Sequence, residues 1–197
     1  MLPSRFLNKT RMIVTNSDIE LAKEIITSNK FIYKLKAGTR QDRRAEFRYE
    51  RFVDELLKII APNGSSYISN DLKSCAFWLT PSMKASNLEL FFALRRSTGL
   101  FMLPNIWNYR NSLMKHNYEK NSCYLFLWGH NTNMNKRVAA DTILTPMLKY
   151  NDENKIYTYT DCVKDADLYI QYGFTEDGKF LHESDTIKIL KRNPIAK

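Results

Sequence analysis

Apolar residues in the first third of the chain recur at helical spacing and predict two amphipathic helices. The first begins near "SDIE" (17–20), a capping-box pattern in which Ser17 and Glu20 each accept a hydrogen bond from the other's backbone N–H, and continues to about Ser28. The second covers "EFRYERFVDELLKIIA" (46–61) and stops at Pro62, which cannot continue a helix. The chain is therefore expected to begin with a helical part.

After these helices the pattern changes to short runs rich in β-branched and aromatic residues. "SSYIS" (65–69) and "KSCAFWLT" (73–80) predict two strands joined by a tight turn. A second capping box, "SNLE", predicts a short helix over 86–95. Pro104 suits the first turn of a further helix over 104–120.

A continuous apolar run marks the middle of the predicted sheet. "SCYLFLWG" (122–129) is expected to form a central strand buried on both faces. Residues 139–148 then predict a helix, which Pro146 weakens near its end. Another strand follows at "KIYTYT" (155–160), where β-branched and aromatic residues alternate.

The last part of the chain predicts one helix and two strands. "VKDADLYIQYGF" (163–174) reads as a helix closed by Gly173 just beyond its end. "FTEDGKFLH" (174–182) and "DTIKILKR" (185–192) predict two antiparallel strands. Helices first, then strands interleaved with helices, predict an α/β (α+β) domain built on one mixed sheet.

Composition is typical of a globular chain with a sizeable core. Of the 197 residues, 44% are hydrophobic and 13% aromatic, and 6 Gly and 6 Pro are too few for a disordered chain. The apolar runs fall far short of the roughly 20 residues that span a bilayer, and no signal-peptide pattern is present, which favours a cytoplasmic protein without membrane association. The three cysteines indicate reduced thiols, and neither they nor the three histidines have metal-ligand spacing (Cys75, Cys123, Cys162, His116, His130, His182).

Charge narrows the class of partner. The formal net charge is +9 and the isoelectric point is near 9.4, which favours an anionic partner such as nucleic acid, a phosphate-bearing cofactor or a membrane surface. One cluster, "RQDRRAEFRYER" (40–51), interleaves arginines with acidic residues. It fits either a solvated helix face or an anion-binding surface, and the sequence leaves both open.

The segment "DADLYIQYGFTEDGKF" resembles the closing signature of the GNAT superfamily of acyl-CoA N-acyltransferases. In that family a helix ends in a Leu-Tyr pair, followed after a short spacer by Gly-Phe opening a strand, and Leu168, Tyr169, Gly173 and Phe174 match this pattern. Upstream, the family's Gln/Arg-x-x-Gly-x-Gly/Ala loop between a strand and a helix falls on 135–140. The match is degenerate: Asn replaces the first polar residue and Val replaces the first Gly, whereas the final Ala is accepted.

The resemblance covers roughly residues 76–192 and implies a fold. We expect a single GNAT-like domain over 1–197, with a mixed, mostly antiparallel central sheet flanked by helices. Its N-terminal helical part spans 1–65, and the sheet core with the cofactor-binding motifs spans 66–197. The implied activity is N-acyl transfer, in which an acetyl or similar group moves from acyl-CoA to a primary amine of a small molecule or peptide.

The resemblance also implies a site for acetyl-CoA or another acyl-CoA. The pyrophosphate is expected at the main-chain amides of one loop (Asn135, Lys136, Arg137, Val138, Ala139 and Ala140), because a helix N-terminus attracts anions. The pantetheine arm is expected along Leu127, Trp128 and Gly129. Without glycine, the loop either keeps its amides aimed at the phosphate and adds two cationic side chains, or has lost the ligand.

Acyl transfer needs a donor for the leaving thiolate and a route for the amine's proton. Tyr169 matches the position that serves the sulfur in the family, although simple core packing is its alternative role. No general base is identified, and His130, Asp161 and Asp185 are all conceivable. The acceptor pocket is expected between the first two helices and the final strands, with aromatic residues that are equally suited to the core (Phe77, Trp78, Trp107, Tyr109).

Two other functions stay open at this point. A GNAT-like domain without catalysis would keep the fold as a binding or interaction module. A basic nucleic-acid-binding protein would use the positive charge and the aromatic residues, although no RNP, KH, helix-turn-helix or zinc pattern supports it.

Overall fold

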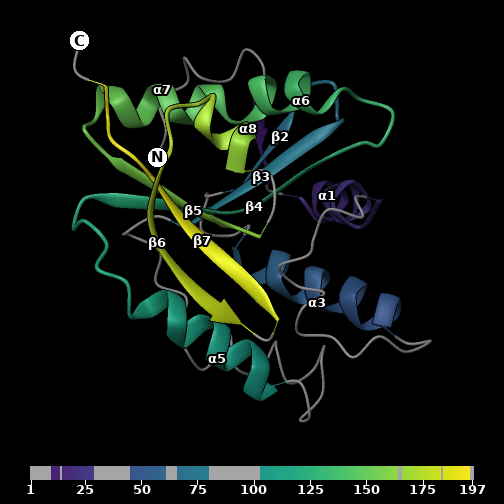
Figure 1. The fold of residues 1–197 in the computed structure, drawn as a ribbon. Coiled ribbons are helices and arrows are strands. Elements are labelled where there is room, and N and C mark those ends of the chain that lie inside the picture. Colours follow the sequence, from purple (N-terminus) through teal and green to yellow (C-terminus); the bar gives the residue numbers. More distant parts are fainter. Residues whose placement is uncertain are drawn as a thin grey trace.

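One mixed sheet with helices packed on both faces forms the protein. The computed structural model describes residues 10–13, 15–28, 45–60, 66–79, 103–163, 166–182 and 184–195. Seven strands lie in the order β1-β2-β3-β4-β5-β7-β6 (Figure 1). The strands are β1 (Thr10–Met12), β2 (Ser66–Ser69), β3 (Ser74–Leu79), β4 (Ser122–His130), β5 (Tyr157–Cys162), β6 (Thr175–His182) and β7 (Asp185–Arg192). The helices are α1 (Asn16–Ser28), α3 (Ala45–Ile60), α5 (Leu103–Met114), α6 (Lys136–Ile143), α7 (Thr145–Glu153) and α8 (Ala166–Ile170).

The sheet is antiparallel except at its centre. β4 and β5 run parallel, whereas the other neighbouring pairs run antiparallel. A parallel pair needs a crossover connection, and α6 and α7 form that connection between β4 and β5. The prediction of an α/β (α+β), mostly antiparallel sheet flanked by helices is therefore confirmed.

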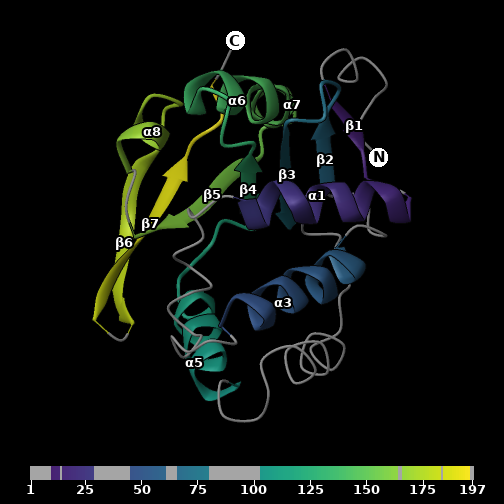
Figure 2. The same cartoon turned by 90° about the vertical axis from the view of Figure 1, so that its right-hand side faces the viewer.

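Apolar cores lie on both faces of this sheet. On one face, α1 and α3 pack against the sheet around Ile26, Leu57 and Phe77, and Figure 2 shows α1 lying across the strands. On the other face, α6, α7 and α8 pack around Trp78 and Leu125. Phe77 and Trp78 are adjacent on β3 and point to opposite faces, as the two-residue period of a strand requires. Both are fully buried, so neither lines an acceptor pocket.

The predicted helix over 139–148 is two helices. α6 ends at Ile143, and Pro146 lies in the first turn of α7. A helix does not use the N–H groups of its first turn, so proline at that place starts a helix instead of weakening one. The crossover consequently has two segments, and the first of them begins directly after the loop that follows β4.

β4 contributes buried residues to the apolar cores on both faces of the sheet, as predicted, with Leu125 in one core and Leu127 in the other. Cys123, Leu125, Leu127 and Gly129 are buried, whereas the residues between them are half-buried. The run appears continuously apolar in the sequence because aromatic side chains occupy half-buried positions (Tyr124, Phe126, Trp128). The half-buried side chains also lie on both faces, since Phe126 packs against the core beneath α1 and α3 and Trp128 against the core beneath α6, α7 and α8.

Several local predictions can be compared directly with the structure. α1 begins two residues earlier than expected, because Thr15 and Asp18 form the reciprocal cap in place of Ser17 and Glu20. α5 ends at Met114, short of the predicted residue 120. The structure also has a strand, β1, before the first helix, and the predicted helix over 86–95 lies outside the described residues.

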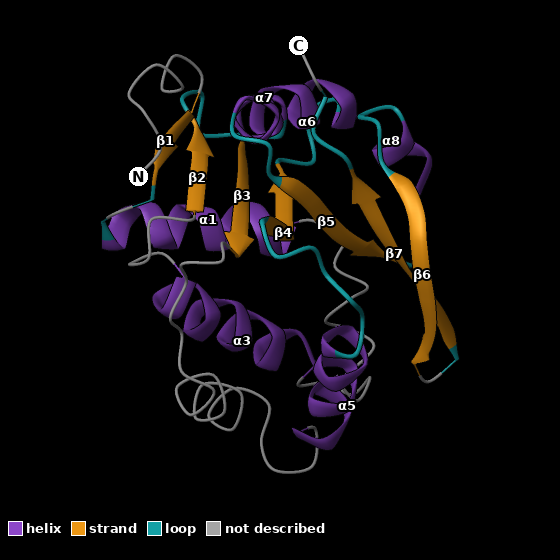
Figure 3. Cartoon of the chain, turned by 90° about the vertical axis from the view of Figure 1, so that its left-hand side faces the viewer, coloured by secondary structure: helices purple, strands orange, loops and turns teal. Residues whose placement is uncertain are grey.

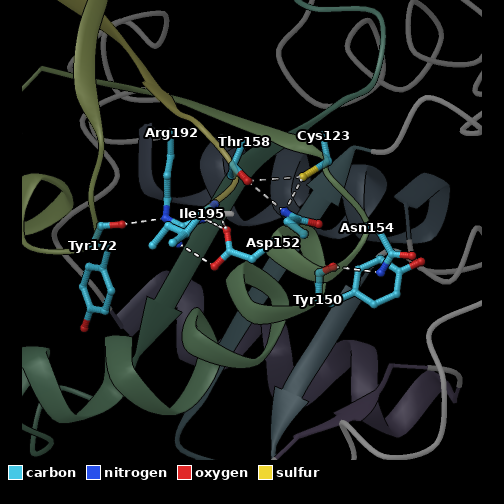
Figure 4. Close-up of polar contacts among 9 residues, drawn as sticks. Cys123, Tyr150, Asp152, Asn154, Thr158, Tyr172, Arg192 and Ile195 are labelled. Carbon is cyan, nitrogen blue, oxygen red and sulfur yellow. Dashed lines mark hydrogen bonds and ion pairs between the residues drawn. The ribbon is translucent and has the colours of Figure 1, made fainter. Parts of the chain in front are cut away.

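The last strand is fastened to the helix layer by a buried arginine. Arg192 donates two hydrogen bonds to the Asp152 carboxylate, at 2.6 and 2.8 Å, and a third to the Tyr172 carbonyl at 2.7 Å (Figure 4). Nearby, Asn151 donates to Cys123 Sγ at 2.9 Å and to the Thr158 hydroxyl at 2.8 Å. These contacts join α7 to β4, β5 and β7, and so fix this helix against the centre of the sheet.

No helix in the described ranges has both the length and the apolar character needed to cross a membrane.

Candidate functional site

The two parallel strands at the centre of the sheet separate partway along their length. Their pairing runs from Ser122 opposite Tyr157 to Leu125 opposite Thr160. β4 continues to His130 and β5 to Cys162 beyond the last pair, and Figure 3 shows the two strands diverging. We call this opening, bounded by Phe126–His130 on β4 and by Asp161 and Cys162 on β5, the fork.

An irregularity in β4 coincides with the start of the fork. Phe77 of β3 lies opposite Leu127, but the next residue, Trp78, lies opposite Leu125. Phe126 is therefore an extra residue in β4, which is the arrangement of a β-bulge. A bulge bends its strand and increases its twist, so it accounts for the departure of β4 from β5 at this point.

A chain of hydrogen bonds closes the inner end of the fork. Trp128 Nε1 donates to the Tyr169 hydroxyl at 3.0 Å, and the Thr160 hydroxyl donates to the Leu125 carbonyl at 3.0 Å. Tyr169 and Thr160 are also hydrogen-bonded to each other. Both contacts lower the pKa of the phenol, and an indole N–H can only donate, so the Tyr169 hydroxyl accepts from Trp128. α8 thus places a phenol between β4 and β5.

Tyr169 keeps its proton at neutral pH. Burial raises the pKa of this phenol, the hydrogen bond from Trp128 lowers it by a smaller amount, and the negative charge of Asp161 raises it again. A phenol with a raised pKa is a poor acid for complete proton transfer but remains a hydrogen-bond donor. The chain turns sharply after α8, because Gly173 has φ +82° and the Phe174 N–H donates to the Tyr169 carbonyl at 3.2 Å.

The start of α6 lies where the sequence predicts the phosphate loop, but its backbone donors already have acceptors. Asn135 Oδ1 accepts from the N–H of Arg137 at 2.9 Å and of Val138 at 3.4 Å. The Asn135 carbonyl accepts from the Ala139 N–H at 3.0 Å, as the first bond of the helix. Asn135 is thus the N-cap of α6 and accepts from three of the six main-chain amides that the pyrophosphate was predicted to use, those of Arg137, Val138 and Ala139.

The other loop residues are divided between core and surface. Ala139 and Ala140 are fully buried, and their small side chains let α6 lie close to the sheet. Val138 is 54% exposed and lies in the first turn of the helix, so the absence of glycine produces neither a steric block nor backbone strain. Lys136 is half-buried and Arg137 is exposed, which leaves positive charge at the end of the helix that attracts anions.

The three residues predicted to contact the pantetheine arm mostly direct their side chains elsewhere. Leu127 belongs to the core beneath α1 and α3. A Cβ on Gly129 would lie 3.3 Å from Ile26 Cα, so glycine is needed there for the close approach of α1. Trp128 is half-buried, and its indole N–H is hydrogen-bonded to the Tyr169 hydroxyl. The side chains of Leu127 and Trp128 are thus already engaged in packing or hydrogen bonding, and Gly129 has no side chain. The backbone of these three residues, which lies beyond the last β4–β5 pair, is therefore the part available to an extended ligand.

The remaining candidates are scattered. His130 is half-buried at the end of β4, with its ring 5.7 Å from that of Trp128. Asp185 begins β7, in the hairpin opposite His182. The Arg110 guanidinium stacks on the Trp107 ring at 5.1 Å. Within the described ranges no group of three or more His, Cys, Asp or Glu residues could hold a metal ion.

For two contacts at the fork, the sequence pattern indicates the faces of the residues but not their partners. The alternation in "KIYTYTDC" places Thr158, Thr160 and Cys162 on one face of β5, and Tyr159 and Asp161 on the other. Thr160 on the first face meets Tyr169. Asp161 on the second accepts hydrogen bonds from Tyr109 and Tyr124. The pattern indicates the face of each residue, whereas the partners come from other elements.

Sequence comparison identifies no relative. No protein-family model matches the chain, and no protein with a curated description matches it.

Comparison with solved structures shows which known proteins share this fold. A protein described as histone acetyltransferase HPA2 and related acetyltransferase, from Corynebacterium glutamicum, superposes with a TM-score of 0.68. The two chains are 12% identical, and the match covers 95% of this chain and 97% of the other. Arylalkylamine N-acetyltransferase 2 from Aedes aegypti superposes with a TM-score of 0.63 at 11% identity, covering 95% and 100%. A polyamine N-acetyltransferase from Drosophila melanogaster, which forms N-acetylagmatine, gives 0.59 at 10% identity, covering 93% and 98%. The chain has the GNAT acetyltransferase fold.

Proposed function

We propose that this chain, which has the GNAT fold, is an N-acyltransferase that moves an acetyl or similar acyl group from acyl-CoA to a primary amine of a small molecule or peptide. The observation that carries the proposal is the fork, where β4 and β5 stop pairing at Leu125 and Thr160 but both continue. Solved acetyltransferases of this fold that act on arylalkylamines and polyamines support an amine acceptor.

The fork suits the pantetheine arm of acyl-CoA. An extended ligand binds to an open strand edge through main-chain hydrogen bonds, in the same way as an added strand. In the proposed complex the arm pairs with β4 along Leu127, Trp128 and Gly129, on the side that β5 has left.

The pyrophosphate would bind at the start of α6 by replacing the side chain of Asn135. A phosphate oxygen carries charge and accepts stronger hydrogen bonds than an amide oxygen, and the helix dipole favours it. The N–H groups of Arg137 and Val138 would then change acceptor, while the Lys136 and Arg137 side chains add charge-assisted contacts. Asn135 is exposed, so its amide can turn into solvent.

In the transfer step, a neutral amine nitrogen attacks the thioester carbonyl carbon, and the carbon–sulfur bond then breaks. The sulfur leaves with the electron pair of that bond and is stabilised by a hydrogen bond as its negative charge develops. It takes up the proton that the nitrogen loses as the amide forms, so the products are the amide and free CoA thiol. We assign this donor role to Tyr169, whose hydroxyl lies at the inner end of the fork. Its hydrogen would be directed to the sulfur when the cofactor is bound.

Thermal stability with and without ligand tests cofactor binding. A ligand that binds the native state alone adds about 2.7 kcal/mol at a concentration of 100 Kd, so acetyl-CoA should raise the Tm by about 5–10 °C for a chain of this size. ADP serves as the control, because it has a pyrophosphate but no arm, and it should shift the Tm less. Release of free thiol from acetyl-CoA, measured with agmatine, spermidine and tyramine, then tests transfer. Absence of any shift with millimolar acetyl-CoA would contradict the proposal.

One observation favours a second candidate, a GNAT-like module without catalysis. The N–H groups at the start of α6 are already satisfied by Asn135, as expected of a helix that has no anion to hold. This candidate predicts neither a thermal shift with acetyl-CoA nor release of thiol. Binding to nucleic acid stays a prediction from charge alone, and salt-sensitive binding to generic RNA that acetyl-CoA does not compete would support it.

A further inference from the structure

A second polar cluster lies at the fork, on the sheet face opposite Tyr169. Asp161 is the first residue of β5 beyond its last pair with β4. Its carboxylate accepts hydrogen bonds from the hydroxyls of Tyr109 on α5 and Tyr124 on β4. Successive residues of a strand face opposite sides, so Thr160 faces Tyr169 and Asp161 faces away from it. We call Asp161, Tyr109 and Tyr124 the carboxylate cluster.

The carboxylate cluster holds a charged group in a place that normally excludes one. Asp161 is 1% exposed, and a buried carboxylate is costly unless its oxygens accept hydrogen bonds. Its two donors come from two separate elements, α5 and β4. A buried acid held by convergent donors beside an opening in a sheet is a candidate for function and not only for packing.

The directions of these hydrogen bonds matter for chemistry. Carboxylate oxygens are acceptors, so both phenols donate to Asp161. Each phenol oxygen therefore still has lone pairs that can accept a hydrogen bond from another group. A protonated amine that donates to either phenol oxygen would be connected to the carboxylate through a single hydroxyl.

We propose that Asp161 is the proton acceptor for the attacking amine and is reached through the hydroxyl of Tyr109 or Tyr124. The inference rests on the proposed acyl transfer. The ammonium group passes one proton to the phenol oxygen while the phenol passes its own proton to the Asp161 carboxylate. The products are a neutral amine, an unchanged tyrosine and a protonated aspartic acid, so protons and charge balance. The amine nitrogen then has the free electron pair that attack on a thioester requires.

The position of the carboxylate cluster fits this role. An alkylammonium with a pKa near 10 is almost wholly protonated at neutral pH, so the reaction needs a base or a rare neutral amine. Tyr169 lies on one face of the fork and Asp161 on the other. The two are close enough for the negative charge of Asp161 to raise the pKa of Tyr169. The group that serves the leaving sulfur and the group that accepts the amine's proton would thus act from opposite faces of one opening.

The two phenols of the carboxylate cluster are neutral at pH 7. Burial raises the pKa of Tyr109 and of Tyr124, and the charge on Asp161 raises both further, so both phenols keep the proton that the relay passes on. Tyr118, after α5, interacts with the cluster, and the His182 ring on β6 lies 5.1 Å from the Tyr109 ring. Cys162 on β5 and Tyr169 on α8 interact with it electrostatically from the opposite face.

Asp161→Asn tests the proposal in the full chain. With acetyl-CoA and the amine that the wild type uses best among agmatine, spermidine and tyramine, kcat/KM should fall at least 100-fold at pH 7. The loss should narrow to less than 10-fold near pH 10, because the amine then arrives neutral. Affinity for acetyl-CoA should change less than twofold. A loss of equal size at every pH, or no loss, would overturn the inference.

Single tyrosine variants keep the inference testable if Asp161→Asn does not fold. Tyr109→Phe and Tyr124→Phe retain the carboxylate and the rings. At least one of them should lower kcat/KM more than 10-fold at pH 7, with the same narrowing at alkaline pH. Tyr157→Phe is the matched control, because Tyr157 lies on β5 against Lys191 and away from Asp161, and it should stay within twofold of the wild type. Unchanged activity in both Tyr109→Phe and Tyr124→Phe would overturn the inference.

The two levels of proposal fail in different ways. If the wild type transfers an acyl group and the Asp161→Asn variant has the same pH profile, the inference falls and the proposed function stands. If the wild type releases no thiol with any amine, both fall together.

Discussion

The fork and the start of α6 are neighbouring parts of one proposed cofactor site, yet they differ in how ready they are for a ligand. At the fork, pairing ends at Leu125 and Thr160, and the β4 backbone continues without β5 beside it. At the start of α6, the side chain of Asn135 already accepts from the helix N–H groups. The first region is open because of strand geometry, whereas the second is closed by a single exposed side chain.

This difference shows that a fold can keep the shape of a site independently of its chemistry. The fork depends on a bulge at Phe126 and on the packing of β4 against α1, which many sequences can provide. Anion binding depends on which acceptor the first N–H groups of one helix prefer. The experiments below therefore alter the two regions separately.

The largest expected effect comes from the fork. Tyr169→Phe removes the proposed donor to the leaving sulfur, and loss of one preorganised donor lowers kcat by about 100-fold. The Kd for acetyl-CoA should change less than threefold, because the phenol is not proposed to hold the cofactor. Steady-state kinetics and calorimetric binding measure the two quantities.

Tyr172→Phe is the matched control for Tyr169→Phe. The Tyr172 hydroxyl donates to Asp141 at 2.7 Å on the exposed side of α6, away from the fork. Its loss should leave kcat within twofold. If Tyr169→Phe also leaves kcat unchanged, Tyr169 is a packing residue and the fork carries no chemistry through it.

An intermediate effect is expected behind the fork, where Asp152 and Arg192 join α7 to β7. Asp152→Asn leaves the guanidinium of Arg192, whose side chain is 6% exposed, without its charged acceptor. Hydrogen bonds to charged groups contribute about 1.5–3 kcal/mol each, so the free energy of unfolding should fall by about 2–3 kcal/mol. Urea denaturation measures it. Asp54→Asn, in an exposed i,i+4 pair with Lys58, should cost less than about 1 kcal/mol.

The same pair predicts how stability depends on pH. Burial raises the pKa of Asp152, but hydrogen bonds from Arg192 and from the Ile195 N–H, together with the charge of Arg192, outweigh it and lower the pKa below its ordinary value. The stabilisation is complete above the unfolded pKa, which is near 3.9, and is lost as the pH falls through the lower folded pKa. The difference in Tm between wild type and Asp152→Asn should therefore shrink below about pH 4, and a constant difference would contradict this.

The smallest expected effect is at the start of α6, and it distinguishes that region from the fork most directly. Asn135→Ala removes the cap of α6 and should lower the free energy of unfolding by about 1 kcal/mol. If the pyrophosphate takes the same N–H groups, it no longer displaces a side chain, and acetyl-CoA should bind up to about fivefold more tightly. Calorimetric binding and urea denaturation measure the two effects. Weaker binding by Asn135→Ala would mean that Asn135 itself contacts the cofactor.

Much of the fold follows from local sequence pattern. The hairpins β2–β3 and β6–β7, the strand β5 and the turn at Gly173 were all predicted, because alternation, β-branched residues and a glycine with positive φ act within a few residues. Errors occurred where two local signals compete. Pro146 fits the end of one helix as well as the start of the next, and the start of α6 at Lys136 was missed because the polar residues before Ala139 read as loop.

The sequence by itself determined the order of most elements, the face on which most strand residues lie and the resemblance at Leu168, Tyr169, Gly173 and Phe174, since each depends on neighbours along the chain. Tertiary structure decided where β4 and β5 separate, which group the Tyr169 hydroxyl contacts, and that Tyr109 and Tyr124 meet at Asp161. These contacts join residues between 37 and 52 positions apart, and no local pattern specifies such pairs. Packing of whole elements brings them together.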